Sequence, residues 1–427
     1  MRELEVSNTG GGSAPGPEPA MPFVQEVLRR LSEARVQYCI LRNYHSLPHG
    51  LNGTDLDLLV NAEDLEDVFQ ILAETAPRHG GAFISRYRAE ALISSFCGRT
   101  DGVWWGVQID VFPGLTHRGV PFYDARDLLR RAQDWHGLPV APEGEATVIA
   151  LLKELLTNSS SRKGYDKQAA VEYASDPASY DKRLAVPFGP DALAAFQRYL
   201  ACLESPALMR TAAHRLRWAL CWRAFWRHPF RLLATKAIGL ARRLRRLFRP
   251  AGIMLAVVGP DATAKSTLLA KIRPVFEAAV HGHVRTAAAG SNPHGLSGGL
   301  RYVLGYWATI YPSLVKRPCI WIFDGYFWDF LFAPLRKGIA LREWVARGVA
   351  LAVPKPDVVI CLGARAETLR LQMPELDPEE LNRQMACLRH LCQKDARAVW
   401  IDADGTPEDT ADRVLAAVVA RASARYA

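Results

Sequence analysis

The feature that most limits the fold of this sequence is a set of four apolar runs in its C-terminal part, at 253–258, 320–323, 358–362 and 398–401. Every position in each run is apolar, so none shows the alternation of a strand with one wet face. Stretches long enough to form helices separate the runs. Such runs are typical of a parallel sheet covered by helices on both faces. The sequence therefore predicts an α/β domain over 251–427.

A phosphate-binding pattern follows the first run directly. It consists of Gly259-Pro260-Asp261-Ala262-Thr263-Ala264-Lys265-Ser266-Thr267, and a helix is expected from Leu268. The pattern G-x-x-x-x-G-K-[ST] is typical of loops whose backbone N–H groups surround phosphate, although Ala264 stands at the second glycine position. We expect Lys265 to contact the terminal phosphates of ATP and Ser266 to bind Mg²⁺. A strand, turn and helix without a ligand is the alternative.

A carboxylate closes the second apolar run. Asp324 ends that predicted strand beside the loop, where it would hold Mg²⁺ or its water shell. The alternative is an aspartate that caps a turn.

These segments together resemble thymidylate kinases over roughly 170 residues. The matching positions are Asp261 in the loop, Asp324-Gly325-Tyr326, Lys355-Pro356-Asp357, and Trp400–Asp404 leading into Pro407-Glu408-Asp409. The resemblance implies a P-loop NTPase fold of the nucleoside monophosphate kinase type. It also implies γ-phosphoryl transfer from Mg-ATP, with catalytic roles for Lys265, Asp261 and Asp324. Gly325 stands where the family carries Arg, so the acceptor stays open between nucleotides and sugar-type molecules.

A second acidic pattern lies near the N-terminus, in Gly53-Thr54-Asp55-Leu56-Asp57. Residues i and i+2 of a strand share a face, so Asp55 and Asp57 can share a divalent metal. Asp110 lies on another predicted strand, 107–112. Three carboxylates on adjacent strands can bind the metals of nucleotidyl transfer. An α/β domain that recognises a ligand without chemistry is the alternative.

The segment from Val36 to Phe112 resembles the nucleotidyltransferase superfamily, in its minimal branch. The Asp-x-Asp pair and the later single Asp of that family match Asp55, Asp57 and Asp110. Proteins that pair this domain with a thymidylate kinase-like domain look like accessory enzymes of bacterial surface-polysaccharide synthesis.

Composition shifts divide the chain into four parts. We expect a disordered tail at 1–20, a nucleotidyltransferase-like domain at 21–140, a helical region at 141–250 and the P-loop domain at 251–427. The protein has a net charge of +9, but residues 205–250 alone hold twelve Lys or Arg and no Asp or Glu. Aromatic and leucine residues are interleaved with these cations. Contact of 210–249 with an anionic membrane is one interpretation, and a solvated helical linker is the other main one; nucleic acid is less favoured.

The eight cysteines form no C-x-x-C pair, and no signal peptide or membrane-spanning run is evident, so we expect reduced thiols in a cytoplasmic protein. The basic segment would allow peripheral contact with the inner face of the membrane. Three functions follow as hypotheses. The first is an ATP- and Mg²⁺-dependent phosphotransferase that binds a nucleotide and a small-molecule acceptor. The second is a metal-dependent nucleotidyltransferase centred on Asp55, Asp57 and Asp110. The third is a non-catalytic scaffold at the membrane surface.

Overall fold

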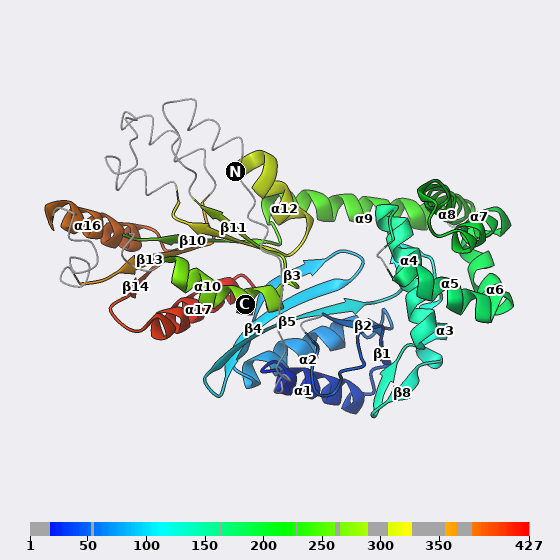
Figure 1. Cartoon of the computed structure of the whole chain (residues 1–427), viewed down its shortest axis with the longest axis horizontal. Helices are drawn as coiled ribbons and strands as arrows, with labels where there is room; N and C mark the ends of the chain where they lie inside the picture. Colours follow the sequence, from blue (N-terminus) through cyan, green and yellow to red (C-terminus); the bar gives the residue numbers. More distant parts are fainter. Residues whose placement is uncertain are drawn as a thin grey trace.

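The computed structural model of this chain describes residues 18–52, 55–161, 164–227, 229–260, 265–288, 306–326, 355–365 and 378–426. Over these residues the protein is α/β, with one mixed and one parallel sheet (Figure 1).

Seven of the described strands form the first sheet, in the order β3-β4-β5-β2-β1-β9-β8. Their bounds are β1 Tyr38–Ile40, β2 Leu56–Val60, β3 Gly81–Arg88, β4 Leu92–Thr100, β5 Val103–Phe112, β8 Gln133–Trp135 and β9 Leu138–Val140. The β2–β5 and β1–β9 pairs are parallel and the others are antiparallel. A small hairpin, β6 Thr116–His117 and β7 Val120–Pro121, follows β5.

Helices cover the two faces of the first sheet differently. One face packs on α1 (Met21–Glu33) and α2 (Leu65–Arg78) through a single apolar core. The other face is divided. At its β1–β2 side it packs on the helical region, and at its β3–β4 side it packs on helices that belong to the second sheet. The helical region begins after the short α3 (Ala125–Arg130). It comprises α4 Glu143–Asn158, α5 Tyr165–Ser175, α6 Pro177–Phe188, α7 Pro190–Ala201, α8 Pro206–Arg227 and α9 Pro229–Phe248.

The second sheet has five described strands, all parallel, in the order β11-β12-β10-β13-β14. Their bounds are β10 Ile253–Val258, β11 Val284–Ala288, β12 Ile320–Asp324, β13 Val358–Gly363 and β14 Ala398–Asp402. The connection after β10 leads toward β11 and the one after β13 leads toward β14, so the chain switches direction between β10 and β13. Its helices are α10 Lys265–Ala279, the π-helical turn η2 Tyr306–Ile310, α12 Tyr311–Lys316, α16 Pro378–Lys394 and α17 Pro407–Ser423.

Helices α10 and α17 lie between the two sheets and share one core with both (Figure 1). Gly106 of β5 approaches α10 so closely that a Cβ atom there would lie 2.1 Å from the carbonyl oxygen of Val275. Trp104 Nε1 donates a hydrogen bond of 2.9 Å to Asp412 of α17. Ser85 Oγ of β3 donates to the backbone carbonyl of Ala251, at 2.8 Å. Helices α10 and α17 of the second sheet are therefore packed directly on the first sheet.

The predicted parallel sheet is confirmed, and each of the four apolar runs lies within one of its strands. The predicted strand at 107–112 is the end of a longer strand, β5. Strands β3, β4, β8, β9 and β11 were not predicted. Most of the expected tail lies outside the described residues. Among the residues of the expected tail that are described, Ala20 is buried and Glu18 accepts a 2.9 Å hydrogen bond from the backbone of Leu51.

Candidate metal centre

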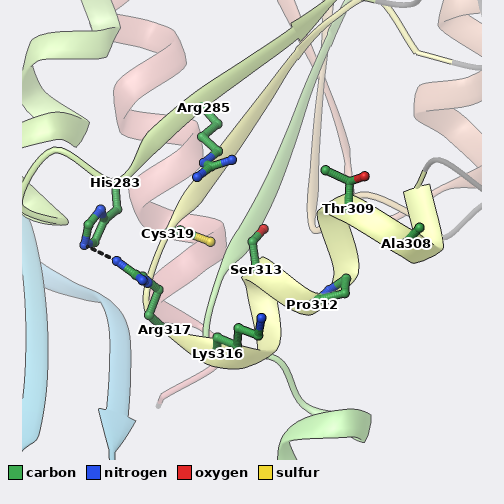
Figure 2. A pocket seen from close by; sticks show the side chains of 9 residues that line it. All are labelled: His283, Arg285, Ala308, Thr309, Pro312, Ser313, Lys316, Arg317 and Cys319. Carbon is green, nitrogen blue, oxygen red and sulfur yellow. Dashed lines mark hydrogen bonds between the residues drawn. The ribbon is translucent and has the colours of Figure 1, made fainter. Parts of the chain in front are cut away.

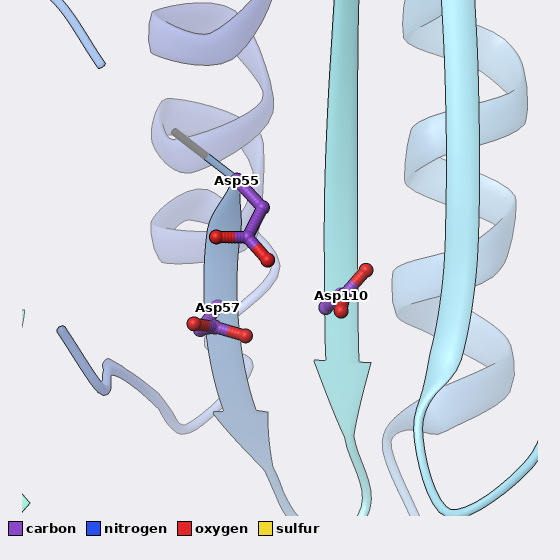
Figure 3. A group of neighbouring side chains, drawn as sticks. All are labelled: Asp55, Asp57 and Asp110. Atoms are coloured by element: carbon purple, nitrogen blue, oxygen red, sulfur yellow. The ribbon is translucent and has the colours of Figure 1, made fainter. Parts of the chain in front are cut away.

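Three buried carboxylates meet on one face of the first sheet. Asp57 of β2 pairs in register with Asp110 of β5, and Asp55 lies two residues before Asp57, just ahead of β2. One oxygen from each carboxylate lies within 4.8 Å of the others (Figure 3). Asp55, Asp57 and Asp110 are 6%, 1% and 8% exposed. We call this cluster the carboxylate triad; it is the arrangement that the spacing of the three aspartates predicted.

Burying the three carboxylates of the triad next to one another is electrostatically unfavourable. Burial, and after it the charges of Asp57 and Asp55, raise the pKa of the Asp110 carboxyl well above its ordinary value. Gln108 Nε2 donates a 3.0 Å hydrogen bond to one Asp110 oxygen, which opposes that rise. Burial also raises the pKa of Asp57, even though Arg42 is paired to it, because desolvation and the charge of Asp55 outweigh the cation.

Arg42 is the cation that neutralises part of this charge. Its Nε atom pairs with Asp57, and its Nη2 lies 3.7 Å from Asp55. The second oxygen of Asp57, Oδ1, is buried and has no hydrogen-bond partner among the described residues. A buried anionic oxygen without a partner costs free energy, and a hard divalent cation is the kind of partner that would remove this cost. The donor set therefore fits Mg²⁺ or Mn²⁺.

A cavity of about 230 Å³ opens beside the triad on the side of the helical region. Arg42 and Asp57 line it, together with Lys153 of α4 and Tyr165 of α5. The Lys153 ammonium lies 4.2 Å from the centre of the Phe112 ring, and its charge lowers the pKa of both Asp57 and Asp110. The cavity thus joins the acidic cluster to two cations.

A second cavity, of about 320 Å³, lies at the amino ends of β11 and β12 in the other sheet (Figure 2). Its polar lining is cationic or neutral: His283, Arg285, Ser313, Lys316 and Arg317 line it, and no described carboxylate does. Arg317 Nη1 lies 3.1 Å from His283 Nε2. We call it the cationic cavity.

One residue of the cationic cavity, His283, is coupled electrostatically to the triad. Burial and then the charge of Arg317 lower the pKa of His283 to about 4, while the charge of Asp55 acts in the opposite direction. The position of Asp110 follows from the pattern of β5. Gly106, Asp110 and Phe112 alternate onto one face of β5. Gly106 lies under α10 and Phe112 packs in the core of the helical region, so Asp110 lies at the seam between them.

The phosphate-loop prediction falls only partly on described residues, because Asp261, Ala262, Thr263 and Ala264 lie outside them. Gly259 and Pro260 follow the carboxyl end of β10, and Lys265, Ser266 and Thr267 open α10. Lys265 is buried, and its Nζ donates to the carbonyls of Gly259 and Pro260 at 2.8 and 2.9 Å.

Asp324 ends β12, and it pairs in register with Val257 of β10, so it lies at the same sheet edge as Gly259. Gly325 follows with a φ of 77° and donates to the Val257 carbonyl at 2.8 Å. This left-handed turn favours glycine.

Sequence reasoning placed the three aspartates but missed the cations around them. Arg42 and Lys153 belong to no motif that the sequence shows. His283, Lys316 and Arg317 carry no motif, because only tertiary packing brings them together around the cationic cavity. All eight cysteines are free thiols, as expected.

No family model matches this chain, and no curated protein matches it.

Proposed function

We propose that this chain is a divalent-metal-dependent transferase that acts on a phosphate-bearing substrate at the carboxylate triad, with nucleotidyl transfer as the reaction class. One observation carries the proposal: three buried carboxylates share one sheet face, and Asp57 has an oxygen without a partner. Structural ion pairs do not call for three adjacent buried anions, whereas catalytic metal sites do.

The described residues suggest a division of roles. Asp55, Asp57 and Asp110 would hold the metal, which would supply positive charge to the phosphate oxygens. Lys153 and Arg42 line the adjoining cavity and would bind the transferred phosphate group. In the reaction an acceptor oxygen forms a bond to phosphorus while the bond to the leaving phosphate group breaks. His283, Lys316 and Arg317 would hold the anionic part of one substrate from the opposite side.

The test measures Mn²⁺ binding by calorimetry and by electron paramagnetic resonance, with the wild-type protein, Asp57→Asn and Asp101→Asn. Asp101→Asn is the matched control, because it removes an exposed carboxylate from the turn between β4 and β5. We expect Asp57→Asn to lose the binding and Asp101→Asn to keep it. Binding that survives Asp57→Asn would contradict the proposal. Release of diphosphate from nucleoside triphosphates then tests the reaction class.

A second candidate function is the ATP-dependent phosphotransferase implied by the resemblance to thymidylate kinases. The observation in its favour is the position of Lys265, seated against two carbonyls at the carboxyl end of the central strand β10, with Asp324 ending the next strand. Ligands of open α/β sheets bind at this edge, near the point where the strand order reverses. Calorimetry with Mg-ATP tests it: Lys265→Ala should abolish binding, whereas Asp57→Asn should leave this site unchanged.

A further inference from the structure

Helix α9 is amphipathic, but its mostly polar side, and not its apolar side, packs on the rest of the protein. Such a helix normally turns its apolar stripe inward. Here Leu232 packs partly against the core of the helical region, and Thr235 lies against Gly119, in the turn between β6 and β7. Further along, the Arg246 guanidinium lies 4.9 Å from the centre of the Tyr87 ring. These inward residues recur at helical spacing, so one mostly polar side of α9 faces the protein.

The opposite side of α9 is apolar and faces solvent. Its large side chains recur three, four or seven residues apart, which keeps them on one side of a helix, and are between 51% and 86% exposed: Phe230 85%, Leu233 60%, Leu240 57%, Leu244 51% and Phe248 86%. Helix α8 adds an aromatic row, with Trp218 stacked on Trp222 at 5.2 Å and Trp226 one turn further. We call these residues the α8–α9 apolar stripe. Exposed apolar stripes of this length mark interaction surfaces.

Cations border the stripe. Arg243 and Arg245 are exposed, and they flank Leu244 by about 100° on either side of the helix. Residues 205–250 contain twelve Lys or Arg and no acidic residue. A second copy of this chain would oppose like charges across a two-fold contact, which is repulsive. A nucleic acid would leave the leucine and phenylalanine side chains without an apolar partner. An anionic lipid surface complements both the charge and the stripe.

We propose that the α8–α9 apolar stripe docks this protein on an anionic membrane surface, with the leucine and phenylalanine side chains of α9 in the acyl boundary and the flanking arginines at the headgroups. Tryptophans such as those of α8 prefer this depth. No helix among the described residues is long and apolar enough to cross a membrane, so the helix would lie in the interface. This proposal does not depend on the proposed function.

The experiment is flotation of the purified full chain with phosphatidylcholine vesicles that contain or lack phosphatidylglycerol. We expect binding to the anionic vesicles, weakened by salt. Leu240→Glu/Leu244→Glu should weaken that binding by at least about a hundredfold. Arg243→Gln/Arg245→Gln should weaken it by about fivefold for each cation removed. Val171→Glu, at an exposed apolar position of α5, is the matched control and should bind like the wild type.

All of these substitutions lie at exposed positions, and circular dichroism checks that each variant folds. The proposal is overturned if the wild-type protein does not float with anionic vesicles, or if the double leucine variant floats as well as Val171→Glu. It is also overturned if the leucine variant converts a dimer to a monomer in ultracentrifugation without any change in flotation. Binding to RNA or DNA that survives the leucine substitutions, with no lipid binding, would assign the cations to nucleic acid instead.

Discussion

The two sites that carry candidate chemistry, one on a face of the first sheet and one at the carboxyl edge of the second, surround their charged groups in opposite ways. At the triad, three carboxylates are buried together, and the single paired cation, Arg42, leaves the pKa of Asp57 and of Asp110 raised. At the edge of the second sheet, the buried Lys265 is held by the carbonyls of Gly259 and Pro260. The first arrangement is costly without a further cation, whereas in the second the described partners of the cation are backbone carbonyls. The contrast teaches that the region with the more familiar motif need not be the one that demands a ligand.

The largest effect that would break this comparison is expected from Arg42→Gln. Removing the partner of a buried carboxylate leaves that charge uncompensated, so the metal-free protein should lose about 3 kcal/mol of unfolding free energy. Mn²⁺ should restore most of the loss, because it replaces the missing positive charge at Asp57. Urea unfolding with and without Mn²⁺ measures this.

Two controls separate this effect from ordinary loss of an ion pair. Lys265→Gln should change stability equally with and without Mn²⁺, since its described partners are neutral carbonyls. Arg29→Gln breaks an exposed pair with Glu26 and should cost about 0.5 kcal/mol or less. If Mn²⁺ restores the stability of Lys265→Gln but not that of Arg42→Gln, the contrast between the triad and the site of Lys265 is wrong.

The next effect is a dependence of stability on pH. The folded state raises the pKa of Asp110, so it keeps a proton that the unfolded chain has already released. The contribution of Asp110 is therefore fully present below the unfolded value, near 3.8, and is lost as pH rises through the folded pKa. In that window the metal-free protein should lose up to about 1.4 kcal/mol per pH unit.

Asp110→Asn should flatten this dependence, because the uncharged side chain no longer titrates. Mn²⁺ should flatten it as well, and its binding should release protons. Urea unfolding at a series of pH values, in chelator and then in Mn²⁺, checks both statements. A difference in unfolding free energy between the wild type and Asp110→Asn that does not fall over the same pH window would contradict the raised pKa of Asp110.

A smaller effect tests whether the cationic cavity binds substrate. Lys316→Gln/Arg317→Gln removes two cations of the cationic cavity, and neither has a described carboxylate within 4.0 Å. If this cavity holds the anionic part of a substrate, KM should rise about tenfold while kcat and Mn²⁺ affinity stay the same. Arg126→Gln, on the exposed α3, is the control. An unchanged KM would confine the site to the first sheet and α4.

The sequence predicted those parts of this molecule that depend on local pattern. The apolar runs defined four strands of the second sheet, and the alternation of Asp55 with Asp57 defined the shared face. Other features depend on tertiary packing. In strands β3 and β4, polar residues interrupt the apolar pattern. Some of these polar residues are buried, because segments distant in the sequence pack over them. Ser85, for example, is a polar residue that is 1% exposed, because its partner is the distant carbonyl of Ala251.

The smallest expected effect tests the hydrogen bond from Ser85 to the Ala251 carbonyl. Ser85→Ala leaves the buried Ala251 carbonyl without the Ser85 hydroxyl, so unfolding free energy should fall by about 1 kcal/mol. Ser94 on the neighbouring strand is the matched control: it is also buried, but its hydroxyl has no hydrogen-bond partner among the described residues. Ser94→Ala should therefore be neutral or slightly stabilising. If the two sheets form one cooperative unit, Ser85→Ala shifts a single unfolding transition. Two separate transitions, with Ser85→Ala changing neither, would mean that the two sheets do not unfold as one unit, and a substrate site shared by the triad and the cationic cavity would have to be abandoned.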